Sequence, residues 1–471
     1  MNNYYLIAFI CYFAFFLGLS IYFYRKNKNA SSFIIGDRKM HYWVTAISAQ
    51  ASDMSDWLFM AYPGLIYVGG LFNVWVAIGL VFFMFLNWQF IAPRLRIETE
   101  RYNSLTLATF FEKIFGDTSG ALRITTVAFT LIFLCFYIAA ELIGLGRLFE
   151  NTFELNYNIG IAISIGLVVL NTLIGGFIAV AWSDMFRGIF LLLMICLVPM
   201  VALKHTGGLS QLVSIAQARA IPLQLFPDYS WITLGTIMSV VMGWGLGYFG
   251  SPHILMNFMA IKEVDKIHKA KFIGISWQIL VLTAATLVGL VGIIFFSTPL
   301  ANKEMVFVAM VKSLFNPLFA GFVLSAILAA TMSVMNAQIL ACASILSEDF
   351  INHLWPHHKA HASLWVLRVS VITIPAISYL ISYNNTSSIN DLVSFAWSGL
   401  GLSFAPLVVT SLYASRYVNK YGALAGMLFG GILGLAWPFL AIPLMPLLPG
   451  FCVSVLIIFG VSAITKHYKF Q

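Results

Sequence analysis

Long apolar segments recur along the whole chain, separated by short polar stretches. An apolar run of about 18 or more residues predicts a transmembrane helix, because that length spans the hydrocarbon core of a bilayer. The pattern predicts about thirteen such helices, centred near residues 14, 56, 82, 135, 168, 193, 241, 284, 332, 374, 402, 432 and 456. We therefore expect an all-α polytopic membrane protein.

The second predicted helix contains polar residues where hydrocarbon would surround it. Asp53 and Asp56, with serines beside them, interrupt the apolar run from Trp43 to Val68. A carboxylate at membrane depth costs about 2.5 to 3.5 kcal/mol, so such residues usually face a water-filled path or bind an ion. Ser and Asp side chains also compete for backbone hydrogen bonds, which favours an opened helix. Its freed carbonyl oxygens would suit a monovalent cation.

The seventh predicted helix is interrupted by the segment GWGLGYFGSP at residues 243–252. Its glycines and proline do not hold a straight helix. Three of the glycines spell G-x-G-x-x-G, but that dinucleotide motif must follow a strand, so we reject this interpretation.

Two broken helices, five helices apart, predict inverted five-helix repeats around a midplane site, which is a LeuT-like transporter core. We expect one transporter domain in which residues 40–205 and 229–415 are the repeats. A first helix within residues 1–28 and C-terminal helices within 420–471 would be peripheral.

Composition and charge fit this picture. Hydrophobic residues make up 60% of the chain and charged residues 9%, which excludes a soluble domain. Arg25, Lys26 and Lys28 follow the first apolar helix, which argues against a cleaved signal peptide. With the N-terminus outside, all but five of the 26 basic residues fall inside, the exceptions being Arg147, Lys204, Arg219, Lys303 and Lys312. This asymmetry predicts a cytoplasmic C-terminus in a bacterial inner membrane.

Other classes of protein fit the pattern less well. Polar residues gather at two breaks and do not follow a continuous pore, which disfavours a channel. No nucleophile is paired with a base, so we expect no enzyme and no catalytic residues. A membrane sensor would need a signalling domain, and we expect none after the last helix. The expected partners are a small-molecule substrate and the lipid bilayer, without nucleic acid or an obligatory protein partner.

The ninth predicted helix is rich in small and hydroxylated residues from Ser325 to Ser347. Ala330 and Ser333, three residues apart, share a face. The carbonyl of Ala330 and the hydroxyl of Ser333 could complete a cation shell begun by the carbonyls of Ala51 and Met54. Taken alone, such a stripe of small residues more often serves helix packing.

Aromatic residues suggest the walls of a cavity. Trp244 and Tyr248 are four residues apart, as are Tyr137 and Glu141 on the fourth helix, so each pair shares a helical face. Aromatic rings suit a small substrate with an apolar body. Glu141 needs a partner or water, because it is an intramembrane carboxylate.

In the twelfth predicted helix, Gly422, Gly426, Gly430 and Gly434 recur at every fourth residue. This spacing allows close helix approach, and we favour packing within one chain over a dimer contact.

Several segments resemble the sodium/solute symporter family, and within it the bacterial sodium/proline symporters. They are SAQASDMSDW, RLRIETE, IGGFIAVAWSD, MGWGLGYFGSPHIL, LFNPLFAGFVLSAILAA and GALAGM, in order over most of the chain. The resemblance implies the inverted-repeat fold, alternating access and sodium-coupled uptake of L-proline.

The resemblance also implies roles for individual residues. Sodium would bind the carbonyl oxygens of Ala51, Met54 and Ala330 and the hydroxyl of Ser333. Asp53 matches an acid that the family needs for sodium coupling. Substrate binding would fall on or beside Ser55, Trp57, Tyr137, Trp244, Tyr248 and Pro252. Asp184 matches an acid linked to ion movement, and Arg38 matches a basic residue at the cytoplasmic mouth.

Four residues depart from the family pattern near the expected site. Val334 stands where a hydroxyl usually binds sodium, and valine has a similar shape without the oxygen. Asp56 replaces glycine, Glu141 replaces a small residue and Asn257 replaces a basic residue. Sodium could still bind, the coupling ion could be a proton instead, or Asp56 or Glu141 could be the counter-ion of a basic amino acid or an amine. We expect sodium as the coupling ion and proline as the substrate, because the aromatic residues at the expected site are of the same types as in the family.

Overall fold

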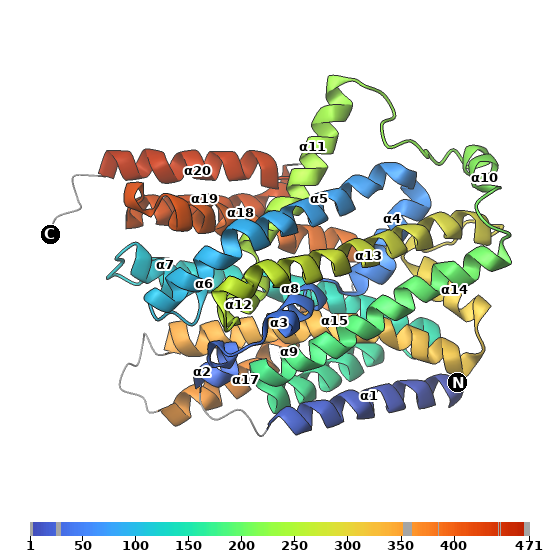
Figure 1. Cartoon of the computed structure of the whole chain (residues 1–471), viewed down its shortest axis with the longest axis horizontal. Helices are drawn as coiled ribbons and strands as arrows, with labels where there is room; N and C mark the ends of the chain where they lie inside the picture. The colour runs from blue at the N-terminus through green and yellow to red at the C-terminus, as the bar shows by residue number, and fades with distance from the viewer. Residues whose placement is uncertain are drawn as a thin grey trace.

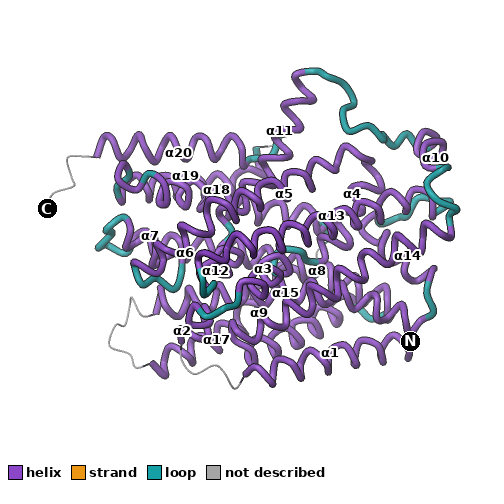
Figure 2. Tube along the Cα trace, in the orientation of Figure 1, coloured by secondary structure: helices purple, strands orange, loops and turns teal. Residues whose placement is uncertain are grey.

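The computed structural model describes residues 3–24, 30–351, 360–384, 386–440, 442 and 444–465. Within these ranges the regular secondary structure is helical, apart from one isolated β-bridge between Met40 and Ile261, and loops and turns connect the helices. Long helices run side by side in one bundle, and α1 begins at the end of the bundle opposite to the one where α20 ends (Figures 1 and 2). The predicted all-α polytopic fold is therefore confirmed.

The longer helices of the bundle are α1 (Asn3–Tyr24), α5 (Val74–Leu86), α8 (Ala121–Phe153), α9 (Tyr157–His205), α13 (Ile267–Phe295), α15 (Pro317–Ile345), α17 (Ala360–Ser382), α18 (Ile389–Tyr413), α19 (Lys420–Ala436) and α20 (Leu447–Ile464). Shorter helices at the ends of the bundle include α6 (Ala92–Arg101), α7 (Leu107–Ile114), α10 (Leu212–Ala218) and α14 (Val306–Leu314).

The predicted number of thirteen spans is not confirmed. In the described ranges, ten helical runs are long and apolar enough to cross a membrane. Asn3–Leu19 and Tyr157–Leu173 are shorter apolar helices, and Trp57–Arg101 counts as one run. That run turns at Gly70 (φ 65°), and α9 changes direction at Gly176 (φ 59°), backbone angles that favour glycine. Among the basic residues used to predict orientation, Arg25, Lys26, Lys28, Lys359, Lys466 and Lys469 lie outside the described residues.

Both predicted helix breaks are present. Helix α3 (Tyr42–Ala51) ends before the non-helical Ser52–Ser55 segment, and the chain resumes with a π-helical turn, η2 (Trp57–Ala61), and α4 (Tyr62–Gly69). Helix α11 (Trp231–Gly245) tightens into the 3-10 segment η5 (Leu246–Gly250). The chain is extended at Ser251 (φ −88°, ψ 103°) before α12 (Pro252–Ala260) begins.

Helices α3 and α12 are joined where they are farthest from the breaks. The Met40 N–H donates to the Ala260 carbonyl at 3.2 Å, and the Lys262 N–H donates to the Met40 carbonyl at 2.9 Å. Helix α3 also packs on α9 and α13, while α18 packs on η5 and α8. The two breaks are therefore enclosed by unbroken helices, as an interrupted backbone at membrane depth requires.

The glycine stripe of α19 packs within the chain, as predicted. A Cβ atom on Gly422 would lie 2.0 Å from Ser462 Oγ of α20, and one on Gly430 would lie 2.0 Å from the Leu402 carbonyl oxygen of α18. A Cβ on Gly434 would lie 2.9 Å from Gly399 Cα. Because these glycines have no side chain, α19 can approach both α18 and α20 closely.

We expect Gly430→Leu to lower the free energy of unfolding by about 1 to 3 kcal/mol, because the new side chain forces α18 and α19 apart. Thermal unfolding of the purified protein in detergent measures this loss. Gly460→Leu on α20 is the matched control, since a Cβ there meets nothing within 4 Å. Equal unfolding temperatures for the two variants would contradict the packing argument.

Candidate functional site

The two helix breaks meet at a hydrogen bond between Asp53 and Tyr248. The Tyr248 hydroxyl donates to Asp53 Oδ2 at 2.5 Å and accepts from Gln278 Nε2 at 2.9 Å. All three side chains are buried. Asp53 comes from the Ser52–Ser55 break, Tyr248 from η5 and Gln278 from α13, so one short chain of hydrogen bonds connects three elements.

A small cavity lies beside this contact. It is lined by one carboxylate and otherwise mostly by aromatic and aliphatic side chains, namely Asp53, Met54, Trp57, Leu80, Tyr137, Trp244, Val393 and Trp397. The ring centroids of Trp57 and Trp244 are 5.1 Å apart. The cavity measures about 10 Å³, which holds no more than one water molecule. In this conformation the aromatic side chains therefore fill most of the space between the breaks.

Two residues of α18 in this cavity, Val393 and Trp397, were not predicted from the sequence. Trp397 Nε1 donates to the Trp244 carbonyl at 2.8 Å, and its ring lies 5.1 Å from that of Tyr248. A Cβ atom on Gly247 would lie 2.1 Å from Trp397 Nε1, so the glycine makes room for the indole. A tryptophan in an unbroken apolar helix carries no signal of this role, which arises only from packing against η5.

A second small cavity, also of about 10 Å³, lies among α3, α9, α12 and α15. Ser48, Asp184, His253 and Asn257 supply its polar lining. The Ser48 hydroxyl donates to Asn257 Oδ1 at 3.4 Å, and Asn257 Nδ2 donates to Ser52 Oγ at 3.3 Å. Asn257 therefore ties α12 to the end of α3.

The residues predicted to bind sodium are all buried, and two of them, Ala51 and Ser333, lie beside α9. Asp184 of α9 faces the Ser333 hydroxyl of α15. One turn further along α9, a Cβ atom on Gly188 would lie 3.2 Å from the Cβ of Ala51. Ser333 Oγ forms no hydrogen bond of good geometry within the described part of the chain. Ala330, Val334 and Met54 are likewise buried.

Two other predicted residues, Asp56 and Glu141, do not line the aromatic cavity. Their carboxyl groups face each other within hydrogen-bonding reach, and both side chains are fully buried. Ser55 Oγ lies beside them and accepts the Trp57 N–H at 3.1 Å. Pro252, the first residue of α12, is buried at the other break.

Arg38 closes one end of the bundle. Its guanidinium donates to the carbonyl oxygens of Met259 (3.0 Å), Thr99 (3.0 Å) and Ser104 (2.7 Å). Burial is the main cause that lowers the pKa of Arg38, to about 10, so it stays charged near neutral pH. Gly36, Asp37 and Arg38 all have positive φ (60°, 53° and 56°), a strained turn that these hydrogen bonds stabilise.

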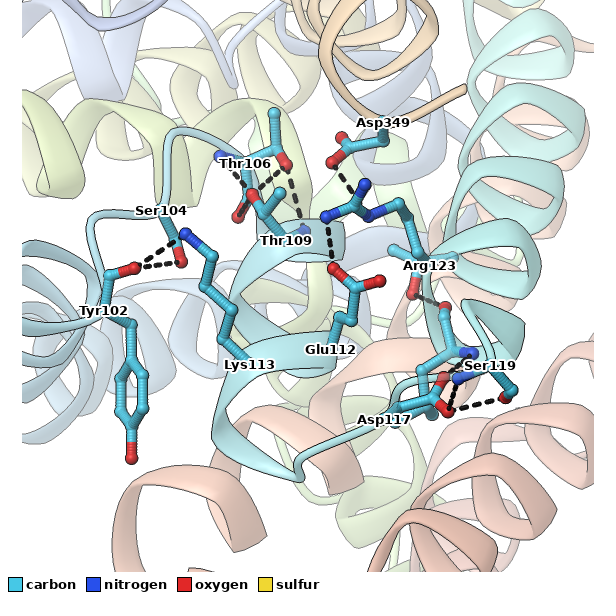
Figure 3. Close-up of polar contacts among 12 residues, drawn as sticks. Tyr102, Ser104, Thr106, Thr109, Glu112, Lys113, Asp117, Ser119, Arg123 and Asp349 are labelled. Carbon is cyan, nitrogen blue, oxygen red and sulfur yellow. Dashed lines mark hydrogen bonds and ion pairs between the residues drawn. The ribbon is translucent and has the colours of Figure 1, made fainter. Parts of the chain in front are cut away.

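A cluster of polar contacts lies around α7 and the start of α8 (Figure 3). Arg123 of α8 forms an ion pair with Glu112 of α7 and lies 3.9 Å from Asp349, near the end of α15. The Thr106 hydroxyl accepts the Thr109 N–H and caps α7. These contacts join α7, α8 and the segment that follows α15.

At the end of the site opposite to Arg38, an ion pair between Arg147 of α8 and Glu304 closes the site. Glu304 Oε1 accepts the Ile389 N–H at 2.9 Å, at the start of α18. Trp57 Nε1 donates to Asn390 Oδ1 at 3.2 Å, so the aromatic cavity is tied to the same closure.

Two broken helices around a small buried site, enclosed by long helices, define a secondary transporter with a LeuT-like core. The chain belongs to the sodium:solute symporter family, whose family model matches residues 33–430. It is therefore a membrane transporter and not an enzyme.

Relatives and solved structures agree with this assignment. The chain is 37% identical to the high-affinity proline transporter PutP of Bacillus subtilis, over 94% of each chain. It is 37% identical to sodium/proline symporter 2 of Staphylococcus saprophyticus, over 98% of this chain and 93% of that one. The structure of a Na+-coupled sialic acid symporter in a substrate-bound outward-open state matches with a TM-score of 0.83, covering 99% of this chain and 98% of that one. At 16% identity, this last match shows a shared fold alone.

We expect Tyr248→Phe to lower the free energy of unfolding by about 1 to 3 kcal/mol, because it leaves buried Asp53 and Gln278 without their shared partner. Thermal unfolding in detergent measures the effect. Tyr229→Phe is the control, because that side chain is 85% exposed. Indistinguishable unfolding of the two variants would show that the hydroxyl does not hold the breaks together.

Proposed function

We propose that this transporter is a sodium-coupled symporter that carries L-proline into the cell by alternating access. The observation that carries the proposal is the Asp53–Tyr248 contact between two helix breaks, at the edge of a cavity walled by aromatic rings. A site with one polar end and apolar walls suits a small zwitterion with an apolar ring. The relatives that are named as proline transporters, and the family description, support the choice of proline and sodium.

Sodium would bind between the opened end of α3 and the middle of α15. The carbonyl oxygens of Ala51, Met54 and Ala330 and the Ser333 hydroxyl are the proposed ligands, with Asp53 nearby. The Ser333 hydroxyl is buried, faces Asp184 and forms no hydrogen bond of good geometry in the described part of the chain, which supports a cation at this position. Asp184 would assist ion movement, since its carboxylate faces that hydroxyl.

Proline would occupy the aromatic cavity once the cavity widens. Trp57, Tyr137 and Trp244 would contact the pyrrolidine ring, and Tyr248 would lie at the polar end with Asp53. The sequence-based prediction that Ser55, Asp56, Glu141 and Pro252 also contribute to substrate binding stays a prediction. Ser55, Asp56 and Pro252 lie at or beside the breaks and Glu141 lies within α8, and none of the four lines the cavity in its closed form.

Transport would alternate between two closures. Opening the Arg147–Glu304 ion pair and the Trp57–Asn390 hydrogen bond would admit sodium and proline from one side. Opening the Arg38 contacts would release them on the other side. Sodium would order the broken segment on which proline then binds, so each ligand raises the affinity for the other.

The proposed orientation follows from the charge asymmetry, with the N-terminus outside, the C-terminus cytoplasmic and Arg38 at the inner mouth of an inner-membrane protein. The proposed repeats remain residues 40–205 and 229–415, each containing one of the two helix breaks. Residues 1–28 and 420–471 would be peripheral to them.

Two buried acids and a missing hydroxyl favour a second candidate function. Asp56 and Glu141 add buried carboxyl groups near the site, and Val334 offers no oxygen ligand. These features suit coupling to protons, or a substrate with a cationic amine such as a basic amino acid.

Uptake of labelled proline into proteoliposomes separates these candidates. We expect an imposed inward sodium gradient to drive accumulation without any pH gradient, because the ligand set described above suits sodium. Uptake that follows a pH gradient and ignores sodium would overturn the sodium assignment. Accumulation of lysine or an amine in preference to proline would overturn the substrate assignment.

We expect Val334→Thr to lower the sodium concentration that gives half-maximal uptake by about 3- to 10-fold, because threonine restores an oxygen in a similar shape. Val323→Thr, also buried and three turns earlier on α15, is the matched control. An unchanged sodium dependence in an active Val334→Thr transporter would exclude position 334 from the cation site.

A further inference from the structure

An apolar groove between α5 and α13 runs along the outside of the bundle, apart from the two small cavities. Its volume is about 460 Å³. Two threonines supply the polar part of its lining, and the other lining side chains are aliphatic or aromatic, among them Val74, Val81 and Phe85 of α5 and Ile275, Ile279 and Leu282 of α13. Because both helices belong to runs long and apolar enough to cross a membrane, the groove faces the hydrocarbon of the bilayer.

The groove ends at a polar pair. Lys271 lies four residues before Ile275 on α13, and Gln89 lies four residues after Phe85, so each continues the helical face that forms the groove. Lys271 Nζ donates to Gln89 Oε1 at 2.6 Å. The same Nζ lies 4.9 Å from the centre of the Phe85 ring. The ammonium group of Lys271 therefore stands at the mouth of the apolar groove.

No acid neutralises this ammonium group in the described part of the chain. Lys271 is only 8% exposed, yet none of the ion pairs there includes it. A lysine offers three N–H donors, and Gln89 supplies a neutral oxygen to one of them. A buried charge without a partner of opposite charge is unfavourable. An anion bound at this end of the groove would therefore stabilise the structure.

Lys271 lies at the same end of the bundle as Arg38, because the Lys262 N–H donates to the Met40 carbonyl shortly before α13 begins. Residues 262–269 add three lysines and two acids, so the segment that precedes Lys271 is also net positive. In the proposed orientation this end is cytoplasmic. Basic residues at the end of a membrane helix attract the anionic headgroups of the neighbouring leaflet.

We propose that the groove binds an acyl chain of an anionic phospholipid whose phosphate group lies at Lys271 and Gln89. The lining on α5 extends from Val74 to Phe85, which is about 16 Å of helix. One leaflet contributes about 15 Å of hydrocarbon, so the groove matches the length of one lipid tail.

The chemistry of the polar end selects the headgroup. The phosphate accepts hydrogen bonds from the ammonium group of Lys271 and from Nε2 of the exposed Gln89. A zwitterionic headgroup brings its own cation to the phosphate and leaves Lys271 without a net counter-charge. The site is independent of the proposed sodium and proline sites, and its test does not require transport.

Native mass spectrometry of the purified full-length protein measures lipid binding directly. We expect phosphatidylglycerol to bind about fivefold more tightly than phosphatidylcholine with the same acyl chains, because one lysine contributes about 1 kcal/mol to the binding of an anionic lipid. Lys271→Gln should abolish this preference, and Lys271→Arg, which keeps the charge, should retain it. Lys269→Gln is the matched control, an exposed lysine on the same helix. Equal binding of both lipids by the wild-type protein, or equal losses in Lys271→Gln and Lys269→Gln, would overturn the proposal.

Filling the groove tests the acyl-chain part and remains available if Lys271→Gln does not fold. We expect Ile279→Trp to weaken the binding of phosphatidylglycerol about tenfold, because the indole takes the space of the lipid tail. Leu280→Trp is the control, since Leu280 is similarly exposed, at 53% against 46% for Ile279, and does not line the groove. Unchanged binding in Ile279→Trp would contradict the assignment of the groove to a lipid.

Two other occupants would also overturn the proposal. Inorganic phosphate that binds as tightly as phosphatidylglycerol would assign Lys271 to a free anion. A dimer without bound lipid that dissociates in Ile279→Trp and persists in Leu280→Trp would assign the groove to a second copy of the chain.

Discussion

The site depends on one constraint: a helix can break inside a membrane only if other parts of the protein satisfy its freed backbone and polar side chains. Here the Asp53 carboxylate receives the Tyr248 hydroxyl, and Tyr248 is in turn held by Gln278 of the unbroken α13. Trp397 adds a bond to the Trp244 carbonyl at the other break. The two breaks therefore satisfy each other through side chains, and the place where they do so is also the place where a ligand would bind.

This arrangement explains how much of the fold and site the sequence could reveal. The breaks were predictable because glycine, proline, serine and aspartate act on the backbone locally. The segment GWGLGYFGSP and the segment with Asp53 and Asp56 can therefore be recognised without knowledge of the rest of the fold. The role of Trp397 could not be predicted, because it depends on how the indole of α18 packs against Gly247 of η5. The number of spans also escaped prediction, since Gly70 and Gly176 decide whether long helical segments are continuous.

Asp56 and Glu141 also show that contacts between distant segments cannot be predicted from the sequence. Asp56 and Glu141 each stood out as a carboxylate in an apolar segment, and each alone suggested a counter-ion for a substrate. In the fold, Asp56 lies against α8 beside Gly144, one turn from Glu141, so the two acids belong to one buried polar group. Three-dimensional proximity therefore changes the chemistry that either residue suggests alone.

The two closures differ in a way that bears on how the molecule opens. The closure at Arg147 consists mainly of side-chain contacts, an ion pair and hydrogen bonds to the start of α18. At the other end, Arg38 binds backbone carbonyls of separate elements, and two backbone hydrogen bonds at Met40 join α3 to α12. Opening there must either break this bridge or carry α3 and α12 along together. Because the bridge joins the ends of α3 and α12 that lie farthest from the breaks, and Asn257 ties α12 to Ser52, movement as a pair preserves more hydrogen bonds than separation. The breaks, which lie at the far ends of the same two helices, are then the natural hinges.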